Sequence, residues 1–315
     1  TRVCVMRFGQ IVELGMADEV LDNPRHDYTR ALLEAIPSNR VPEARGGERP
    51  APLLEVRNLN KVFRSRGGLF KPAREVRALD DVSFTLAPGE TVGIVGESGS
   101  GKSTLGRCVV RLERPDSGTL ALAGTDFSAL RGDVLRRERH RVQMIFQDPY
   151  ASLNPRHRVG YAIAQGPMAN GVPKDEAMHQ AEELLELVGL GAVAVDRFPH
   201  EFSGGQRQRI GIARALALNP ELIVADEAVS ALDVSIQAQV LELLEELKQK
   251  LSLSLLFITH DLRVAAQICD TIIVMQQGRI VEQGTAQEVF VKPREAYTRQ
   301  LLDAIPGRAH EAAMA

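Results

Sequence analysis

Nine consecutive residues, Gly96 to Thr104, have the composition of a phosphate-binding loop. They read Gly-Glu-Ser-Gly-Ser-Gly-Lys-Ser-Thr and match the pattern G-x-x-x-x-G-K-[ST]. Glycines let backbone N–H groups converge on phosphate oxygens, and the start of the following helix favours negative charge. Lys102 is expected to reach the β- and γ-phosphates of a nucleotide, and Ser103 to ligate Mg²⁺. The residues expected to contact the nucleotide are Gly96, Ser98, Gly99, Gly101, Lys102, Ser103 and Thr104. A plain glycine-rich turn is the alternative.

A second candidate site is the apolar run 222–225, which ends in two carboxylates, Asp226 and Glu227. Asp226 is placed to hold Mg²⁺, directly or through water. Glu227 could polarise an attacking water as a general base. A strand that merely ends in an acidic cap is the alternative, and the motif gains weight only beside the phosphate loop.

A third motif reads Phe-Ser-Gly-Gly-Gln and occupies residues 202–206. A serine and two glycines just before a helix form a second potential anion site, with free N–H groups at the helix N-terminus. A chain with one nucleotide loop has no obvious need for another phosphate cradle. The candidates in this motif are Ser203, Gly205 and Gln206.

These motifs need a scaffold of alternating strands and helices. Strands are expected at 53–63, 79–86, 91–95, 142–146, 222–225 and 255–258, and helices from Lys102 and over 174–190, 206–218 and about 240–251. Residues 64–78 are expected to form an excursion loop. The alternation predicts an α/β fold with a largely parallel sheet covered on both faces, where ligands bind at the carboxyl ends of the strands.

Composition limits the remaining possibilities. The 315 residues carry a net charge of −3, which gives no basic excess for nucleic acid. The three cysteines are far apart, which argues against disulfides and zinc and predicts a reducing compartment. No apolar run approaches the ~18 residues that cross a membrane, and the first residues lack a signal-peptide layout. The basic stretch 131–141 is expected to be a solvated helical face rather than a nucleic-acid contact.

The two ends of the chain repeat each other. Residues 5–37 align with 274–306 without a gap at an offset of 269 residues, and 20 of the 33 positions are identical. The simplest interpretation is a tandem protein, in which residues 1–40 are the C-terminal tail of an upstream, truncated domain and 41–52 are a linker. A self-contained chain with a duplicated tail is the alternative.

At Phe202 to Gln206 the sequence resembles the ABC transporter ATPases, whose signature LSGGQ it copies with Phe in the Leu position. The resemblance runs from about residue 53 to 306. It implies a P-loop NTPase fold with a RecA-like parallel sheet and helices on both faces, an antiparallel β subdomain and an inserted helical subdomain at about 148–212. The ATPase domain would span 53–285, and 286–315 would be a peptide-importer-type extension. ATP and Mg²⁺ are the implied cofactors.

The resemblance also implies further site residues. Gln147 corresponds to the Q-loop, with a role in catalysis and metal binding, and Asp233 to the acidic residue of the D-loop. His260 matches the switch histidine that touches the γ-phosphate. Phe63 is the candidate to stack on adenine. The catalytic set is therefore Glu227, His260, Gln147 and Lys102, and the metal set is Ser103, Gln147 and Asp226.

Three segments resemble the dipeptide and oligopeptide importers, a branch that also serves nickel and glutathione: 146–156, 232–239 and 297–306. Ala228 departs from that pattern, which usually has Pro there; Ala is expected to be tolerated. The branch implies pairing with a second ATPase domain, which is either the upstream half or another copy. In this family two domains pair head to tail, so that Ser203 and Gly205 would serve the nucleotide of the paired domain. The branch also implies two membrane permeases near residues 150–156, an extracytoplasmic solute-binding protein, and a peripheral place on the cytoplasmic face of the inner membrane. No nucleic-acid partner is expected.

Two other functions remain possible at this point. One is an ABC-type ATPase that is not coupled to transport, which would need coiled-coil or basic insertions that the sequence does not show. The other is an interaction module with degenerate ATP sites, against which the intact Lys102, Asp226, Glu227 and His260 argue. The solute is not specified by the sequence, and the direction of transport rests on resemblance alone.

Overall fold

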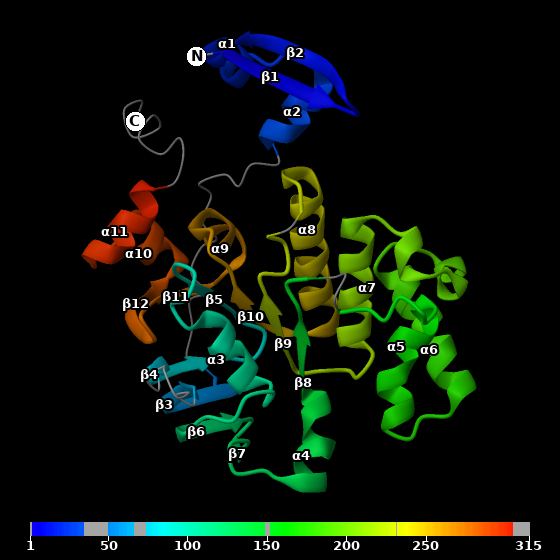
Figure 1. The fold of residues 1–315 in the computed structure, drawn as a ribbon, viewed down its shortest axis with the longest axis vertical. Helices are drawn as coiled ribbons and strands as arrows, with labels where there is room; N and C mark the ends of the chain where they lie inside the picture. The colour runs from blue at the N-terminus through cyan, green and yellow to red at the C-terminus, as the bar shows by residue number, and fades with distance from the viewer. Residues whose placement is uncertain (1, 35–49, 66–73, 149–151, 231, 305–315) are drawn as a thin grey trace, which may run out of the picture.

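The computed structural model describes residues 2–34, 50–65, 74–148, 152–230 and 232–304. Its centre is a six-stranded sheet in the order β12-β11-β5-β10-β9-β8 (Figure 1). Five strands are parallel, and β12 joins β11 as an antiparallel hairpin. The strands are β5 (Thr91–Val95), β8 (Val142–Ile145), β9 (Leu222–Asp226), β10 (Ser254–Ile258), β11 (Thr271–Gln276) and β12 (Arg279–Thr285).

Every residue of β5, β9 and β10 is buried, as expected for parallel strands covered on both faces. Alternate residues enter two different cores. Val95, Ile223 and Phe257 pack with the helices of one face. Val92, Val224 and Leu256 pack on the other face with helix α3 (Lys102–Val109) and a second sheet. The helices of the first face include α7 (Gly204–Leu216), α8 (Val234–Leu251), α9 (Leu262–Ile268) and α10 (Ala286–Val291).

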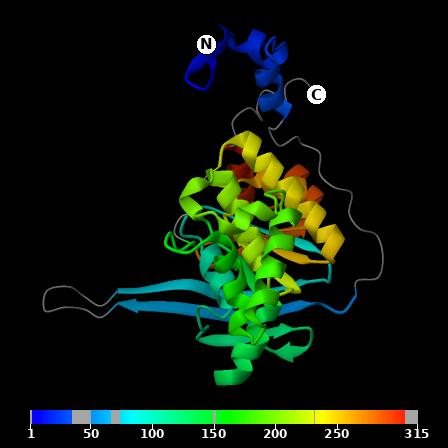
Figure 2. The same ribbon diagram turned by 90° about the vertical axis from the view of Figure 1, so that its right-hand side faces the viewer.

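The second sheet has four antiparallel strands in the order β4-β3-β6-β7. They are β3 (Leu54–Ser65), β4 (Arg74–Leu86), β6 (Ser117–Leu122) and β7 (Thr125–Asp126). The expected excursion loop over 64–78 was wrong at both edges, because β3 and β4 stay paired from Leu54↔Leu86 to Ser65↔Arg74. The pair forms a long arm, seen in profile in Figure 2. Residues 66–73 lie outside the described part of the chain.

Two further helices, α5 (Val159–Ala169) and α6 (Lys174–Leu187), lie beyond strand β8 and pack with α7 (Figure 1). Their contacts are apolar and run through Ile163, Ala181 and Leu185. The chain leaves the sheet after β8, forms these helices, and returns through α7 to β9. The insertion therefore leads directly into the start of α7, which carries Ser203. A short helix α4 (Gly132–Glu138) precedes β8.

The sequence repeat is also a structural repeat. The first copy folds as β1 (Arg2–Arg7), β2 (Gln10–Met16), α1 (Ala17–Asp22) and α2 (Asp27–Glu34). All eight bounds equal those of β11, β12, α10 and α11 (Ala296–Asp303) minus 269. The register irregularity after Val5 recurs after Val274.

The two copies differ in burial. Strand β11 lies between β12 and β5, and its residues 272–275 are fully buried. Strand β1 pairs only with β2 among the described strands, and the side chain of Met6, the counterpart of Met275, is 56% exposed. Phe8, Ile11 and Leu14 are also exposed. An isolated two-stranded hairpin is only marginally stable in water. The first copy therefore resembles the β11–β12 hairpin without the rest of the sheet to which β11 and β12 belong.

Across the described residues, every helix is too short or too polar to span a lipid bilayer.

Candidate nucleotide site

The phosphate loop connects β5 to α3 and depends on glycine at specific points. Gly99 and Gly101 have φ of +82° and +107°, values that side chains rarely adopt. A Cβ on Gly101 would lie 2.3 Å from the Ala78 carbonyl oxygen, so the loop is also packed closely against β4. Because α3 begins at Lys102, the loop N–H groups and the helix N-terminus open into the same space.

The Lys102 ammonium is folded back onto this loop. Its Nζ donates to the carbonyl oxygens of Gly96 at 2.7 Å and Glu97 at 2.9 Å. Burial lowers the pKa of Lys102, and the nearby carboxylates of Glu227 and Asp226 oppose that shift. Lys102 is thus a desolvated cation held above the phosphate loop, poised to exchange two carbonyl acceptors for phosphate oxygens.

Asp226 ends β9 beside the first turn of α3. The Ser103 hydroxyl donates to its Oδ1 at 2.9 Å. Burial raises the pKa of Asp226, and the hydrogen bond from Ser103 opposes this. A buried carboxylate and a hydroxyl oxygen in contact are hard ligands of the kind that Mg²⁺ prefers. The donor set therefore fits a magnesium ion, with Ser103 and Asp226 as its protein ligands.

The next residue, Glu227, directly follows β9, and its side chain lies near residues that follow the ends of β8 and β10. The Gln147 amide, just after β8, donates to Glu227 Oε2 at 2.7 Å. His260, just after β10, places Nδ1 3.8 Å from the same oxygen. These are the ends that the sequence predicts for a parallel sheet, now with the side chains in contact.

Glu227 has φ of +47°, an uncommon conformation for a residue with a side chain. It is held there because its N–H donates to Ile258 O, and its carbonyl accepts from the N–H and hydroxyl of Ser230. The following Ala228 is 2% exposed and packs in the core. Hydrogen bonds at Glu227 therefore hold this loop without the proline that is usual at position 228.

An open pocket of about 400 Å³ lies over the loop. Its wall includes Phe63, which faces Val76 across the β3–β4 ladder. Phe63 is 39% exposed and Val76 is 47% exposed, so the pair presents an apolar surface on which a flat ring could stack. The sequence gives no signal for Val76, which lies in the expected loop 64–78, because its place beside Phe63 depends on the pairing of β3 with β4. The other lining residues are Arg77, Ala78, Ser98, Gly99, Gly101, Lys102, Ser103, Thr104, Gln147 and Glu227.

The second anion motif is at a different place. Ser203 caps α7: its Oγ accepts from the N–H of Gln206 at 3.3 Å, while Gln206 Oε1 accepts from Ser203 N–H at 3.0 Å. Gly205 packs so closely on Ile236 of α8 that a Cβ would lie 2.3 Å from its Cγ2. None of these residues lines the pocket above Lys102 in the part of the chain that the structure describes. Asp233 caps the neighbouring helix α8 by accepting from Ile236 N–H.

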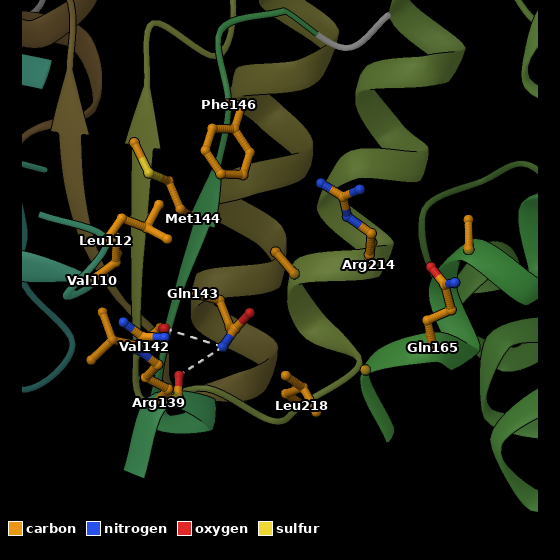
Figure 3. Close-up of a pocket in the computed structure, with 13 residues that line it drawn as sticks. Val110, Leu112, Arg139, Val142, Gln143, Met144, Phe146, Gln165, Arg214 and Leu218 are labelled. Carbon is orange, nitrogen blue, oxygen red and sulfur yellow. Dashed lines mark hydrogen bonds between the residues drawn. The ribbon is translucent and has the colours of Figure 1, made fainter. Parts of the chain in front are cut away.

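A second hollow, of about 300 Å³, lies between the end of β8 and the helical insertion (Figure 3). Leu112, Arg139 and Phe146 line one side, and Gln165, Arg214 and Leu218 line the other. Leu112 is 54% exposed, which leaves an apolar surface open to solvent. Burial lowers the pKa of Arg214, whose guanidinium donates to Ser152 O. The hollow combines apolar walls with two cations.

The fold and the pocket define a P-loop nucleotide-binding protein of the α/β class. Comparison with known proteins narrows this. The model of the ABC transporter family matches residues 79–230, and the model of the oligopeptide/dipeptide transporter C-terminal region matches 12–73 and 281–313, once in each copy of the repeat. The chain belongs to the ABC transporter family, as an ATP-binding cassette with this C-terminal region.

Its relatives are named for import. A putative peptide import ATP-binding protein of Brucella ovis is 51% identical over 256 residues, which cover 81% of this chain and 79% of the relative. The glutathione import ATP-binding protein GsiA of Pectobacterium atrosepticum is 43% identical over 331 residues, covering 97% of this chain and 53% of the relative. The chain thus spans about half the length of that relative.

Solved structures support the fold assignment. The chain superposes on cbiO1 from Clostridium perfringens, part of the ABC transporter complex cbiONQ, with a TM-score of 0.67 at 26% identity, over 83% of this chain and 99% of that one. It also superposes on the dimeric ATP-binding cassette MJ0796 bound to ADP and Pi, with a TM-score of 0.65 at 28% identity, over 74% of this chain and 98% of that one. The expected ABC ATPase fold is therefore confirmed.

Proposed function

We propose that this chain binds and hydrolyses ATP to power an ABC importer for peptides or related small solutes. The observation that carries the proposal is the convergence of Lys102, Asp226 and Glu227 at one edge of the sheet, beside a pocket that can hold a nucleotide. Peptide and glutathione import are the functions in the names of the relatives, and the shared cassette supports the same class of solute here.

In the proposed site, ATP lies with its base on Phe63 and Val76 and its phosphates on the loop from Gly96 to Thr104. Lys102 would leave its two carbonyl acceptors for phosphate oxygens. Ser103 and Asp226, with Gln147, would hold Mg²⁺, which neutralises phosphate charge when bound. Glu227 would take a proton from the attacking water through the carboxylate that Gln147 already orients. His260 would lie beside the γ-phosphate and hold its orientation.

The motif at Ser203 supports a proposed head-to-tail pair of cassettes. Its helix N-terminus lies outside the pocket of its own chain, so a nucleotide that it contacts must be bound elsewhere. The related cassette MJ0796 is dimeric in its solved structure. In such a pair, Ser203, Gly205 and Gln206 would close on the nucleotide of the opposite cassette, with Asp233 at the seam.

The hollow in Figure 3 is the proposed docking place for a membrane permease. It lies between strand β8, which leads into Gln147, and the helical insertion, which carries Ser203. A permease segment seated there would touch both elements of the nucleotide site. Of the expected contact segment 150–156, residues 150 and 151 lie outside the described chain. The proposal places the protein peripherally on the cytoplasmic face of the membrane, with two permeases and an extracytoplasmic solute-binding protein as partners.

Residues 1–40 are proposed to be the C-terminal part of a second cassette, joined through 41–52 to a cassette over 53–285 and its extension 286–315. The support is the structural repeat: β11 pairs with β5 as well as with β12, whereas β1 pairs only with β2 among the described strands, and its residue Met6 is exposed. The second match to the C-terminal region model at 12–73 supports the same interpretation. The helical insertion remains assigned to about 148–212, and 41–49 lie outside the described residues.

The test of the proposed function is ATP hydrolysis by the 315-residue chain and its Lys102→Ala variant. We expect phosphate release by the parent, and weaker nucleotide binding with loss of hydrolysis in the variant, because the buried cation expected to contact the phosphates is gone. The variant is otherwise mild, since the hydrogen bonds of the Lys102 ammonium go to carbonyl oxygens of the loop itself, those of Gly96 and Glu97. Equal turnover by parent and variant would show that the phosphate loop is assigned wrongly.

A further inference from the structure

The outer side of the phosphate loop rests on the C-terminal repeat segment. The N–H of Gly278, in the β11–β12 turn, donates to Ser100 O at 2.9 Å. The N–H of Glu97 donates to the hydroxyl oxygen of Tyr297, on α11, at 3.1 Å. These two hydrogen bonds join the loop to the C-terminal segment through residues that are not among those lining the nucleotide pocket.

Tyr297 is a single side chain that links an element 200 residues away to the loop. It is 9% exposed, and burial raises the pKa of its hydroxyl, so the group is neutral at physiological pH. A neutral hydroxyl accepts from an N–H without adding a negative charge that would repel phosphate. The donor, the N–H of Glu97, belongs to the second residue of the phosphate loop. It precedes in sequence the N–H groups at the start of α3.

The position of Tyr297 is itself held in place. The Glu282 carboxylate on β12 accepts from the N–H groups of Arg294 at 2.7 Å and Glu295 at 3.2 Å, just before α11 begins. Glu282 is 9% exposed, and these backbone hydrogen bonds keep its pKa below the usual value although burial opposes them. A chain of contacts therefore runs from β12 through the start of α11 to the phosphate loop.

The loop needs such support because of its composition. Gly96, Gly99 and Gly101 all have positive φ, and glycine loses more conformational entropy on ordering than any other residue. A loop that is ordered before the nucleotide arrives binds it more tightly, since the ordering does not have to accompany binding.

We propose that Tyr297 is a positioning residue for the nucleotide: the C-terminal extension holds the phosphate loop in its binding conformation through the Tyr297–Glu97 hydrogen bond. The inference rests on the proposed ATP site. It assigns to the extension a direct role in nucleotide affinity, in addition to its packing.

The first copy of the repeat offers a matched control. Tyr28 is the counterpart of Tyr297, and Glu13 accepts from Arg25 and His26 N–H groups as Glu282 does from its own pair. The Tyr28 ring, however, lies 4.9 Å from the guanidinium carbon of Arg7, and among the described residues its hydroxyl makes no hydrogen bond to the loop 96–104. Tyr28→Phe and Tyr297→Phe thus remove the same atom from the same local fold, but only Tyr297→Phe also removes the contact with the loop.

The experiment measures two quantities on the 315-residue chain: affinity for a fluorescent ATP analogue, and amide hydrogen exchange. For Tyr297→Phe we expect about three- to tenfold weaker binding of the analogue, which corresponds to the net free energy of one hydrogen bond. The value of kcat should be largely unchanged. Exchange should accelerate at residues 96–101 and stay unchanged in α11, because phenylalanine keeps the ring packing. Tyr28→Phe should match the parent in both measurements.

Unchanged affinity and unchanged loop exchange in Tyr297→Phe would overturn the proposal. Faster exchange throughout α11 and the sheet in Tyr297→Phe would also overturn it, because Tyr297 would then stabilise the whole fold and not the phosphate loop in particular. Failure of the proposed function looks different: the parent itself would not bind the analogue, whereas the exchange comparison at residues 96–101 would still report on the Tyr297–Glu97 hydrogen bond.

Discussion

Replacing Glu227 by glutamine tests the chemistry with the least disturbance to the structure. The side chain keeps its size, and its remaining carbonyl oxygen can still accept from Gln147 Nε2, now 2.7 Å from Glu227 Oε2. The strained backbone at Glu227 is held by main-chain bonds to Ile258 and Ser230, which the substitution leaves in place. The change therefore removes the proton acceptor and little else.

A positioned general base contributes about 10²- to 10⁴-fold to a rate. At about 1.4 kcal/mol per tenfold, this corresponds to about 3–5 kcal/mol of the activation barrier. We therefore expect Glu227→Gln to bind ATP at least as tightly as the parent while phosphate release falls by two to four orders of magnitude. The assay is steady-state phosphate release at saturating ATP, with nucleotide affinity measured in parallel.

A variant that traps ATP should also reveal the pairing state. Light scattering on Glu227→Gln should show a mass that doubles from 34.5 kDa only with ATP if two copies of the chain form the head-to-tail pair. Bound ATP without doubling would point to a different cassette as the natural partner. Hydrolysis at the parental rate would refute the assignment of Glu227 as the base.

Two more predictions concern stability and are checked by thermal unfolding. Burial raises the pKa of Asp226 in the folded state above its unfolded value of 3.8. The stability that the neutral carboxyl gives is therefore fully present below the unfolded pKa and is lost as pH rises through the folded pKa. Without Mg²⁺ and nucleotide, Asp226→Asn should raise the melting temperature at pH 7 by a few degrees, and this gain should shrink as pH falls towards 3.8. An unchanged or lower melting temperature at pH 7 would contradict this reasoning. Gly205→Ala should destabilise the chain by about 1–3 kcal/mol, because its Cβ would lie 2.3 Å from Ile236, whereas Gly204→Ala, with 3.7 Å to Leu232, should cost much less. Equal melting temperatures for the two glycine variants would show that α7 and α8 separate easily.

Much of the site could be predicted from local sequence. The phosphate loop and the strand that ends in Asp226 and Glu227 are each carried by consecutive residues, whose chemistry depends on short-range geometry. The alternation of strands and helices then predicts that the ends of β5, β8, β9 and β10 meet at one edge of the sheet. The repeat at offset 269 is likewise a property of sequence alone, and it predicts equal folds because equal local sequences have equal preferences.

Tertiary structure decided what depends on partners far apart in the chain. The extension of β3 to Ser65 and the start of β4 at Arg74 rest on the pairing of these strands with each other, which carries no clear local signal. The opposite burial of Met6 and Met275 depends on what covers them: Met275 packs in the core between the central sheet, α3 and the second sheet, whereas Met6 is exposed. The contact of Tyr297 with Glu97 joins residues 200 positions apart, and only the packed arrangement of α11 against the sheet brings that hydroxyl to the phosphate loop.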